Sequence, residues 1–205
     1  RDGKVFVGGW SQGAYFTYRY AINNPNLKGI IPIDIVYNLD PTLTDIADKT
    51  IADIATRMTK INSGIYYEDV LASKFIAYQT LTNPDGPSTI IPGLTNKQVA
   101  LLAATATYQF GVNPIPNYQG DLTGLRYTDL NFVMQQGLKL NNFQSILPLT
   151  ELRQQWLIPE IPNITVPILY VGAEYGFSTF GLYTPNMIHN TNPGVGTYIV
   201  SDYGH

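Results

Sequence analysis

The chain has 205 residues, which is enough for one sizeable hydrophobic core. Hydrophobic residues make up 44% of it and charged residues 13%, a balance that is typical of a folded globular protein and excludes a disordered one. The net charge of −3, without any cluster of Lys or Arg, argues against nucleic-acid binding. Zero cysteines exclude disulfides, thiolate metal sites and a cysteine nucleophile, and we expect neither a metal nor a cofactor.

Every apolar run is shorter than the roughly 20 residues that span a bilayer, so the sequence predicts no membrane span. The first residues, Arg-Asp-Gly-Lys, are not followed by a hydrophobic signal segment. Low charge and abundant Asn, Thr, Tyr and Pro favour an exported protein, and Asn163-Ile164-Thr165 is a formal acceptor for N-glycosylation. We therefore predict a secreted or extracytoplasmic location.

The first predicted elements are a strand, a helix and a second strand. Residues 4–8 form a short apolar run ended by glycine, which is typical of a buried strand. Residues 14–23 contain no helix breaker, and Asn24-Pro25 then predicts the end of a helix. Residues 29–35 are the next apolar run. This order predicts a parallel βαβ unit and hence an α/β fold with a parallel sheet.

A long insertion with helical patterning follows. The spacing of its apolar residues predicts a helix over 43–61, and Thr95 with Gln98 forms a capping box ahead of another helix. Further helices are predicted near residues 68–80, 128–140 and 150–157.

Strand patterning returns in the last part of the chain. Residues 166–172 and 197–200 are apolar runs that predict two further strands. Between them, Thr184 is predicted to cap a short helix that has Pro185 in its first turn. The predicted division is a core segment of residues 1–37, a helical cap of residues 38–162 and a second core segment of residues 163–205.

A pentapeptide at the end of the first strand carries the main chemical signal. In Gly9-Trp10-Ser11-Gln12-Gly13, glycines stand two residues on either side of a serine, after a predicted strand and before a predicted helix. A nucleophilic serine needs such a sharp turn, because small flanking residues leave room for its hydroxyl to project clear of the sheet. We predict that Ser11 is a nucleophile. The alternative is a glycine-rich turn whose serine only caps the helix.

Other glycine-rich interpretations fail on spacing. Gly8 and Gly13 are separated as in a phosphate-binding loop, but Ala14 and Tyr15 stand where that loop needs Lys and Ser or Thr. A Gly-x-Gly-x-x-Gly pattern is also lacking, so dinucleotide binding has no support.

The general base must come from two histidines. His205 follows the last predicted strand, and open α/β sheets assemble their sites at the carboxyl ends of strands. His189 lies in a short polar helix, which is typical of a solvated surface residue. We therefore predict that His205 is the base that activates Ser11. The alternative is an unpaired terminal histidine.

The elbow after a strand, the helical insertion, Val-Pro-Ile-Leu-Tyr-Val-Gly at residues 166–172 and the final Tyr-Gly-His together resemble the second half of the α/β-hydrolase superfamily. Capped esterases and lipases are nearer kin than cutinases, which are similar only at the elbow. The resemblance implies acyl transfer to Ser11, proton shuttling by His205 and an oxyanion hole that uses the backbone N–H of Gln12. The second oxyanion donor is expected from a loop upstream of Arg1.

The same resemblance implies a triad acid three residues after the glycine that ends the penultimate strand. That position is Tyr175, which cannot serve as an acid. We therefore predict Glu174, one residue earlier, as the acid that orients His205. Asp34, at the end of the second strand, is the first alternative, and Asp202 is the second.

Two functions of different class are predicted. The first is a serine hydrolase that cleaves carboxylic esters through an acyl-enzyme on Ser11, and the apolar, weakly charged insertion suits a neutral acyl or aromatic ester. The second is a non-catalytic binding or structural subunit that has kept the elbow and lost its acid. A serine peptidase or an acyltransferase on the same frame is a further alternative.

Further polypeptide that completes the sheet is also expected. The resemblance implies several strands ahead of the nucleophile strand, and a sheet of four parallel strands would leave an edge and part of a face exposed. We expect a second chain or a missing upstream segment to complete the sheet. The other expected partner is a small-molecule ester.

Overall fold

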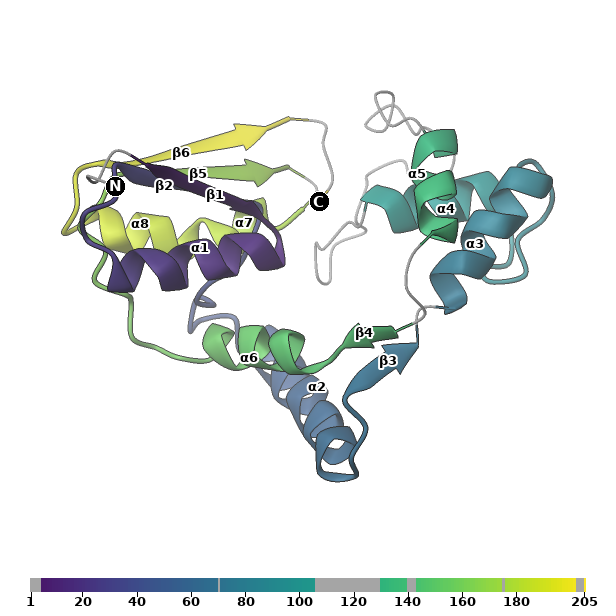
Figure 1. Ribbon diagram of the computed structural model, residues 1–205, viewed down its shortest axis with the longest axis horizontal. Coiled ribbons are helices and arrows are strands. Elements are labelled where there is room, and N and C mark those ends of the chain that lie inside the picture. Colours follow the sequence, from purple (N-terminus) through teal and green to yellow (C-terminus); the bar gives the residue numbers. More distant parts are fainter. Residues whose placement is uncertain (1–4, 70, 106–129, 140–142, 175, 202–204) are drawn as a thin grey trace.

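The computed structural model describes residues 5–69, 71–105, 130–139, 143–174, 176–201 and 205. The described strands of the core form a four-stranded parallel sheet in the order β1-β2-β5-β6 (Figure 1). Because all four run in one direction, their carboxyl ends meet at one edge of the sheet, and the C-terminus lies beside that edge (Figure 1). The strands are β1 (Phe6–Trp10), β2 (Gly29–Ile33), β5 (Ile168–Ala173) and β6 (Val195–Val200).

Helices cover one face of this sheet (Figure 1). The inward-facing side chains Ile30, Ile168 and Tyr170 pack there with Ala14 and Tyr18 in the main hydrophobic core. Burying these apolar surfaces is the dominant favourable contribution to folding. The covering helices are α1 (Gln12–Asn23), α7 (Ser178–Gly181) and α8 (Tyr183–His189).

The opposite face of the sheet is largely open. Side chains alternate between the two faces along each strand, so every second residue of β1 and β5 points away from the helices. Phe6 is 52% exposed, Trp10 57%, Leu169 45% and Tyr198 61%. A parallel sheet is normally covered on both faces, so this open apolar face is unusual.

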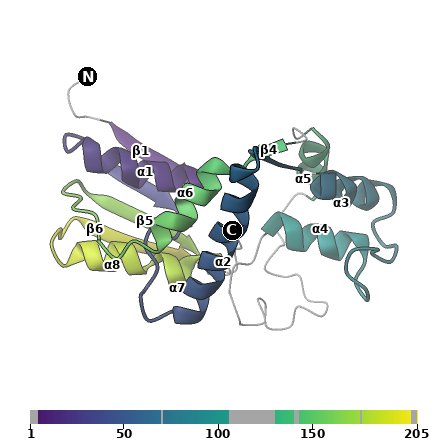
Figure 2. The same cartoon turned by 90° about the horizontal axis from the view of Figure 1, so that it is seen from below.

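The chain between β2 and β5 is built around two helices and a ribbon. Helices α2 (Thr44–Asn62) and α6 (Leu147–Trp156) pack against each other. Beyond them, β3 (Tyr67–Asp69) and β4 (Phe143–Ser145) pair antiparallel and lead to a separate group of helices, as Figures 1 and 2 show. That group is α3 (Leu71–Thr82), α4 (Asn96–Thr105) and α5 (Leu130–Leu138), with a small core of Ala77, Ala100 and Met134. None of the helices in the described ranges is long and apolar enough to cross a membrane.

The predicted capping box is confirmed. The backbone N–H of Gln98 donates to Thr95 Oγ1 at 3.2 Å, and the N–H of Thr95 donates to Gln98 Oε1 at 2.8 Å. The helix predicted to start near residue 68 instead begins at Leu71, because residues 67–69 pair with β4.

The prediction that Thr184 caps α8 is wrong. Leu182 holds that position, while Thr184 is fully buried and its hydroxyl accepts the backbone N–H of Asn38 at 2.9 Å. The threonine therefore joins two parts of the core that lie far apart in the sequence.

Candidate active site

Ser11 lies at the sharp turn between β1 and α1. Its φ of 54° and ψ of −125° are unusual for a residue with a side chain, and such strain is typical of functional turns. Its backbone N–H donates to the carbonyl of Ile33 at 3.0 Å, which ties the turn to the end of β2. A Cβ on Gly9 would collide with the backbone of Gly13 and lie 2.7 Å from Thr17 Oγ1. Glycine at position 9 is therefore required by close packing.

Gly13 differs from Gly9 in this respect. A Cβ at this position would meet no atom within 4 Å outside the neighbouring helix backbone. Both glycines were predicted to provide room for the turn. Steric packing requires glycine at position 9 but not at position 13.

Ser11, His205 and Asp34 form a hydrogen-bonded triad. His205 Nε2 lies 2.7 Å from Ser11 Oγ, and His205 Nδ1 lies 2.6 Å from Asp34 Oδ2. The side chains of His205 and Asp34 are only 6% and 2% exposed. The three residues come from the carboxyl ends of β1, β2 and β6, so the parallel sheet brings together residues up to 194 positions apart. The predicted contact between Ser11 and His205 is confirmed.

The carboxylate of Asp34 is held by the turn that follows β5. Its Oδ1 accepts the backbone N–H groups of Ala173 and Phe177, each at 2.9 Å, while Oδ2 faces the imidazole. Asp34 itself has a φ of 46°, so the chain turns sharply as it leaves β2. A buried carboxylate needs such partners, because an unpaired one is costly to remove from water.

The carboxylate at His205 Nδ1 is that of Asp34, the first alternative, whereas Glu174 was predicted to lie there. The end of β5 contributes hydrogen-bond donors to the carboxylate and not the carboxylate itself. The backbone N–H of Glu174 donates to the carbonyl of Val200, continuing the ladder between β5 and β6. Asp202, the second alternative, and Tyr175 lie outside the described residues.

Two aromatic rings flank the imidazole of His205. The ring of Trp10 lies 5.1 Å from it between centroids, tilted by 32°, and the ring of Phe177 lies 5.0 Å away in an edge arrangement. Phe177 is buried, whereas Trp10 is exposed. These contacts orient the ring and exclude water from its faces. Neither role is visible in the sequence, because both depend on the folding of distant segments against each other.

Two neighbours of Asp34 show how tightly its surroundings are packed. A Cβ on Gly176 would collide with the carboxylate, so this position requires glycine. Burial, followed by the nearby negative charge of Asp34, raises the pKa of Tyr170 far above its ordinary value. The Tyr170 hydroxyl donates to the carbonyl of Ile35 at 3.2 Å.

The other predicted site residues are placed as follows. Gln12 is the first residue of α1, and its backbone N–H has no intrahelical acceptor, as is usual at a helix N-terminus. His189 is exposed near the end of α8, away from the triad. Within the part of the chain that the structure describes, no group of three or more His, Asp or Glu side chains is arranged to hold a metal ion.

The arrangement combines a parallel sheet, a strained serine between strand and helix, and partners in the chain order Ser, Asp, His. This combination of a parallel sheet, a turn with a strained serine and that order of partners matches the pattern of the α/β-hydrolase fold from β1 onward. No protein-family model matches its sequence, and a comparison with curated proteins finds no relative.

Solved structures of α/β-hydrolase fold are similar to the chain at low sequence identity. The chain resembles Rv0554 from Mycobacterium tuberculosis with a TM-score of 0.46 and 12% identity, covering 98% of this chain and 58% of that one. An acetylester hydrolase from Corynebacterium glutamicum has a TM-score of 0.44, 14% identity and coverage of 98% and 54%. A marine microorganism esterase has a TM-score of 0.41, 16% identity and coverage of 99% and 64%. The chain therefore spans less than two thirds of the length of each of these structures.

Proposed function

We propose that the protein is a serine hydrolase that cleaves carboxylic esters through an acyl-enzyme on Ser11. The single observation that carries this proposal is the hydrogen-bonded triad, with contacts of 2.7 Å from Ser11 to His205 and 2.6 Å from His205 to Asp34. Those distances match what proton transfer between a nucleophile, a base and an orienting acid requires.

In the proposed reaction, Ser11 Oγ attacks the ester carbonyl while His205 Nε2 takes its proton. The Asp34 carboxylate holds the imidazole in the tautomer that leaves Nε2 free to accept, and stabilises the imidazolium that forms. The N–H of Gln12 donates to the developing oxyanion. His205 then protonates the departing alcohol, and water enters by the same steps in reverse to release the acid and regenerate Ser11.

The structure bears on the alternative of a non-catalytic subunit. That alternative rested on the loss of an acid from the usual position after β5. Asp34 supplies a buried carboxylate from the neighbouring strand end, so this reason no longer applies. We retain a neutral acyl or aromatic ester as the proposed substrate class and an exported location, both inferred from composition.

Covalent labelling with a fluorophosphonate probe tests the proposal, because that reaction requires an activated serine and not merely an exposed one. We expect the unchanged chain to be labelled and the Ser11→Ala variant to remain unlabelled. A series of p-nitrophenyl esters of increasing chain length then defines the acyl group. Equal labelling of both proteins would point to a different nucleophile, and labelling without turnover of any ester would favour the peptidase or acyltransferase alternatives.

We also propose that the open face of the sheet is covered by further polypeptide carrying strands that extend the sheet beyond β1. Parallel strands are normally covered on both faces, but four large apolar side chains on this sheet are exposed, namely Phe6, Trp10, Leu169 and Tyr198. In addition, β1 pairs only with β2 among the described strands. Intact-mass measurement of native material tests this. A longer chain or a tightly bound second chain supports it, and an active monomer of 22.7 kDa overturns it.

A further inference from the structure

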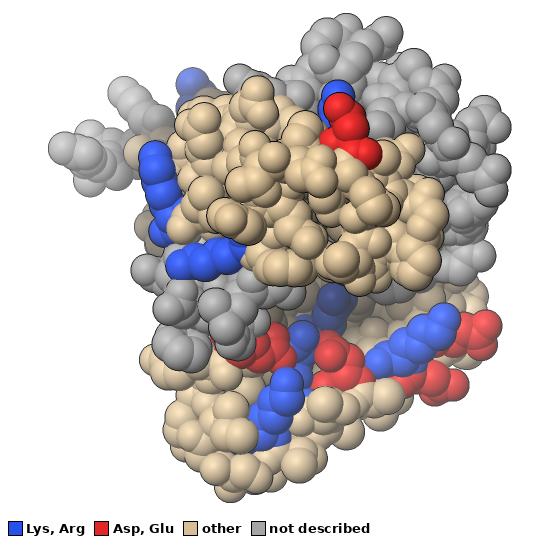
Figure 3. All heavy atoms as spheres, turned by 90° about the vertical axis from the view of Figure 1, so that its right-hand side faces the viewer, with Lys and Arg blue, Asp and Glu red and all other residues tan. Residues whose placement is uncertain are grey.

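A cluster of six charged residues lies where α2 and α6 pack together. The two helices carry four Lys and Arg residues and four carboxylates, but three basic residues and a single carboxylate line the cavity between them. Figure 3 shows charged side chains gathered on the lower half of one face of the molecule. Helices α2 and α6 lie at the same height in Figure 1. The six residues are Lys49, Arg57, Lys60, Arg153, Asp53 and Glu68.

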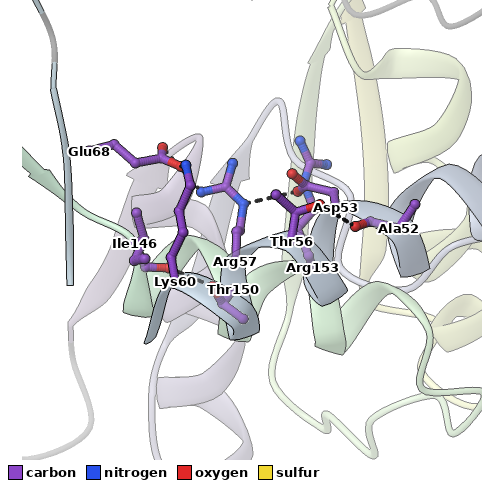
Figure 4. A network of polar contacts seen from close by, with 9 residues as sticks. All are labelled: Ala52, Asp53, Thr56, Arg57, Lys60, Glu68, Ile146, Thr150 and Arg153. Carbon is purple, nitrogen blue, oxygen red and sulfur yellow. Dashed lines mark hydrogen bonds and ion pairs between the residues drawn. The ribbon is translucent and has the colours of Figure 1, made fainter. Parts of the chain in front are cut away.

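One carboxylate in this cluster serves two guanidinium groups. Arg57 Nε donates to Asp53 Oδ2 at 3.0 Å, and Arg153 Nε lies 3.7 Å from the same oxygen (Figure 4). Arg57 Nη1 also lies 3.3 Å from Glu68. Lys49, one turn before Asp53, forms no ion pair within the described part of the chain.

A cavity of about 200 Å³ opens between the two helices at this point. Lys49, Asp53, Arg57 and Arg153 line its polar side, and Trp156 lines it from α6. The Arg153 guanidinium lies 3.9 Å from the centroid of the Trp156 ring, a cation–π contact that holds the guanidinium in place.

Trp156 gives an independent sign that a ligand is accommodated here. Its side chain is 2% exposed, and its indole Nε1 is buried without an acceptor among the described residues. Buried N–H groups are nearly always paired in native proteins, so an orphan beside a cavity calls for an acceptor.

We propose that this cavity binds a small dianionic oxyanion of the phosphate or dicarboxylate type. The charged side chains that line the cavity are three basic residues and one carboxylate, which sum to +2 and are compensated by two negative charges. Guanidinium groups offer planar pairs of N–H donors that match such oxygens, and the indole N–H adds a neutral donor. A cation would be repelled, and a neutral ligand would leave the charge unbalanced.

The cavity is separate from the triad, although aromatic contacts connect the two. The rings of Trp156 and Phe177 lie 5.9 Å apart in an edge arrangement, and Phe177 in turn contacts His205. No residue that lines the cavity belongs to the triad. The proposal therefore stands whether or not the protein hydrolyses esters.

Binding is measured with sulfate, which is a dianion at all pH values near neutrality, and then with inorganic phosphate. The sequence has two tryptophans, so a Trp10→Phe background leaves Trp156 as the single fluorescent reporter. We expect a saturable change in fluorescence as sulfate replaces chloride at constant ionic strength. Isothermal calorimetry on the unsubstituted chain gives the same constant without relying on the Trp10 variant.

Three variants locate the site. Arg153→Gln should weaken sulfate binding by about tenfold or more, because a charge-assisted donor is lost. Lys49→Gln should weaken it by about two- to fivefold and leave the melting temperature unchanged, since Lys49 is exposed and forms no ion pair with the residues that the structure describes. Lys97→Gln, which removes the same charge from α4, is the control and should bind like the parent.

The outcomes separate cleanly. Absence of saturable binding to the unsubstituted protein overturns the proposal. Binding that Lys49→Gln and Lys97→Gln weaken equally also overturns it, because the attraction would then be a general effect of charge. Loss confined to the two cavity variants supports it, and the Lys49 variant does so even if Arg153→Gln fails to fold.

Discussion

Two aspartates, one in the core and one in the inserted segment, have opposite surroundings. Asp34 is 2% exposed and is held by two backbone N–H groups and an imidazole. The Asp53 side chain is 38% exposed and is shared between two long, flexible arginine side chains. A buried carboxylate fixed by backbone donors has one geometry, whereas an exposed ion pair is weakened by water and by the entropy of its partners. The surroundings of Asp34 therefore suit chemistry that needs a fixed geometry, whereas those of Asp53 suit the attraction of charged groups.

The largest expected effect comes from Asp34→Asn. The amide would still accept the backbone N–H groups through its oxygen, but its NH₂ would face Nδ1 and favour the wrong imidazole tautomer. We expect turnover of a p-nitrophenyl ester to fall by about 10³- to 10⁴-fold with little change in KM. Glu174→Gln is the matched control and should retain turnover within about twofold. The opposite ranking of the two variants would restore Glu174 as the acid.

Gly176→Ala tests whether packing holds the Asp34 carboxylate in position. The added methyl would collide with that carboxylate and force it to move. We expect turnover to fall by at least about tenfold and the free energy of unfolding to fall by about 1–3 kcal/mol. Gly196→Ala is the control, because its methyl would meet Leu169 at an ordinary distance of 3.8 Å. If urea denaturation and kinetics do not distinguish the two alanine variants, the turn after β5 has room to adjust.

Lys60→Gln tests the exposed side of the comparison. Lys60 Nζ lies 3.2 Å from Glu68 Oε1, and the two side chains are 42% and 29% exposed. We expect the free energy of unfolding to fall by less than about 1 kcal/mol, and by less still at high salt, with turnover unchanged. A loss as large as that of Gly176→Ala, measured in the same denaturant, would mean that this ion pair behaves like a buried one.

The smallest effect is expected at Asp40, a partly exposed carboxylate whose pKa is lowered mainly by the hydrogen bond from the Thr42 hydroxyl and then by the Thr42 backbone N–H. Because the folded pKa lies below the unfolded value, this contribution is present above the unfolded pKa and is lost as pH falls through the folded one. Thr42→Val should therefore be slightly less stable than the parent at pH 7. The difference should vanish in strong acid, and a constant difference across thermal melts from pH 7 to pH 2 would contradict this assignment.

Local sequence features predicted the frame well. The runs predicted at residues 4–8 and 166–172 overlap β1 and β5, which begin at Phe6 and Ile168, and the Asn24-Pro25 stop agrees with the end of α1 at Asn23. Such features depend on side-chain periodicity and turn chemistry within a few residues, which a sequence displays directly. The antiparallel ribbon of β3 and β4 was not predicted, because its two strands of three residues are separated by the α3–α5 helices and each is too short to show a pattern.

The sequence by itself predicted that Ser11 lies in a tight turn after a strand and favoured His205 over His189 as its base. Only the tertiary structure decided which acid completes the triad, because that choice depends on the strand order β1-β2-β5-β6. This order places the end of β2 beside the serine and leaves the turn after β5 to donate N–H groups to Asp34. The charged cavity between α2 and α6 likewise required the fold, since Lys49 and Arg153 lie about a hundred residues apart and meet only when two distant helices pack together.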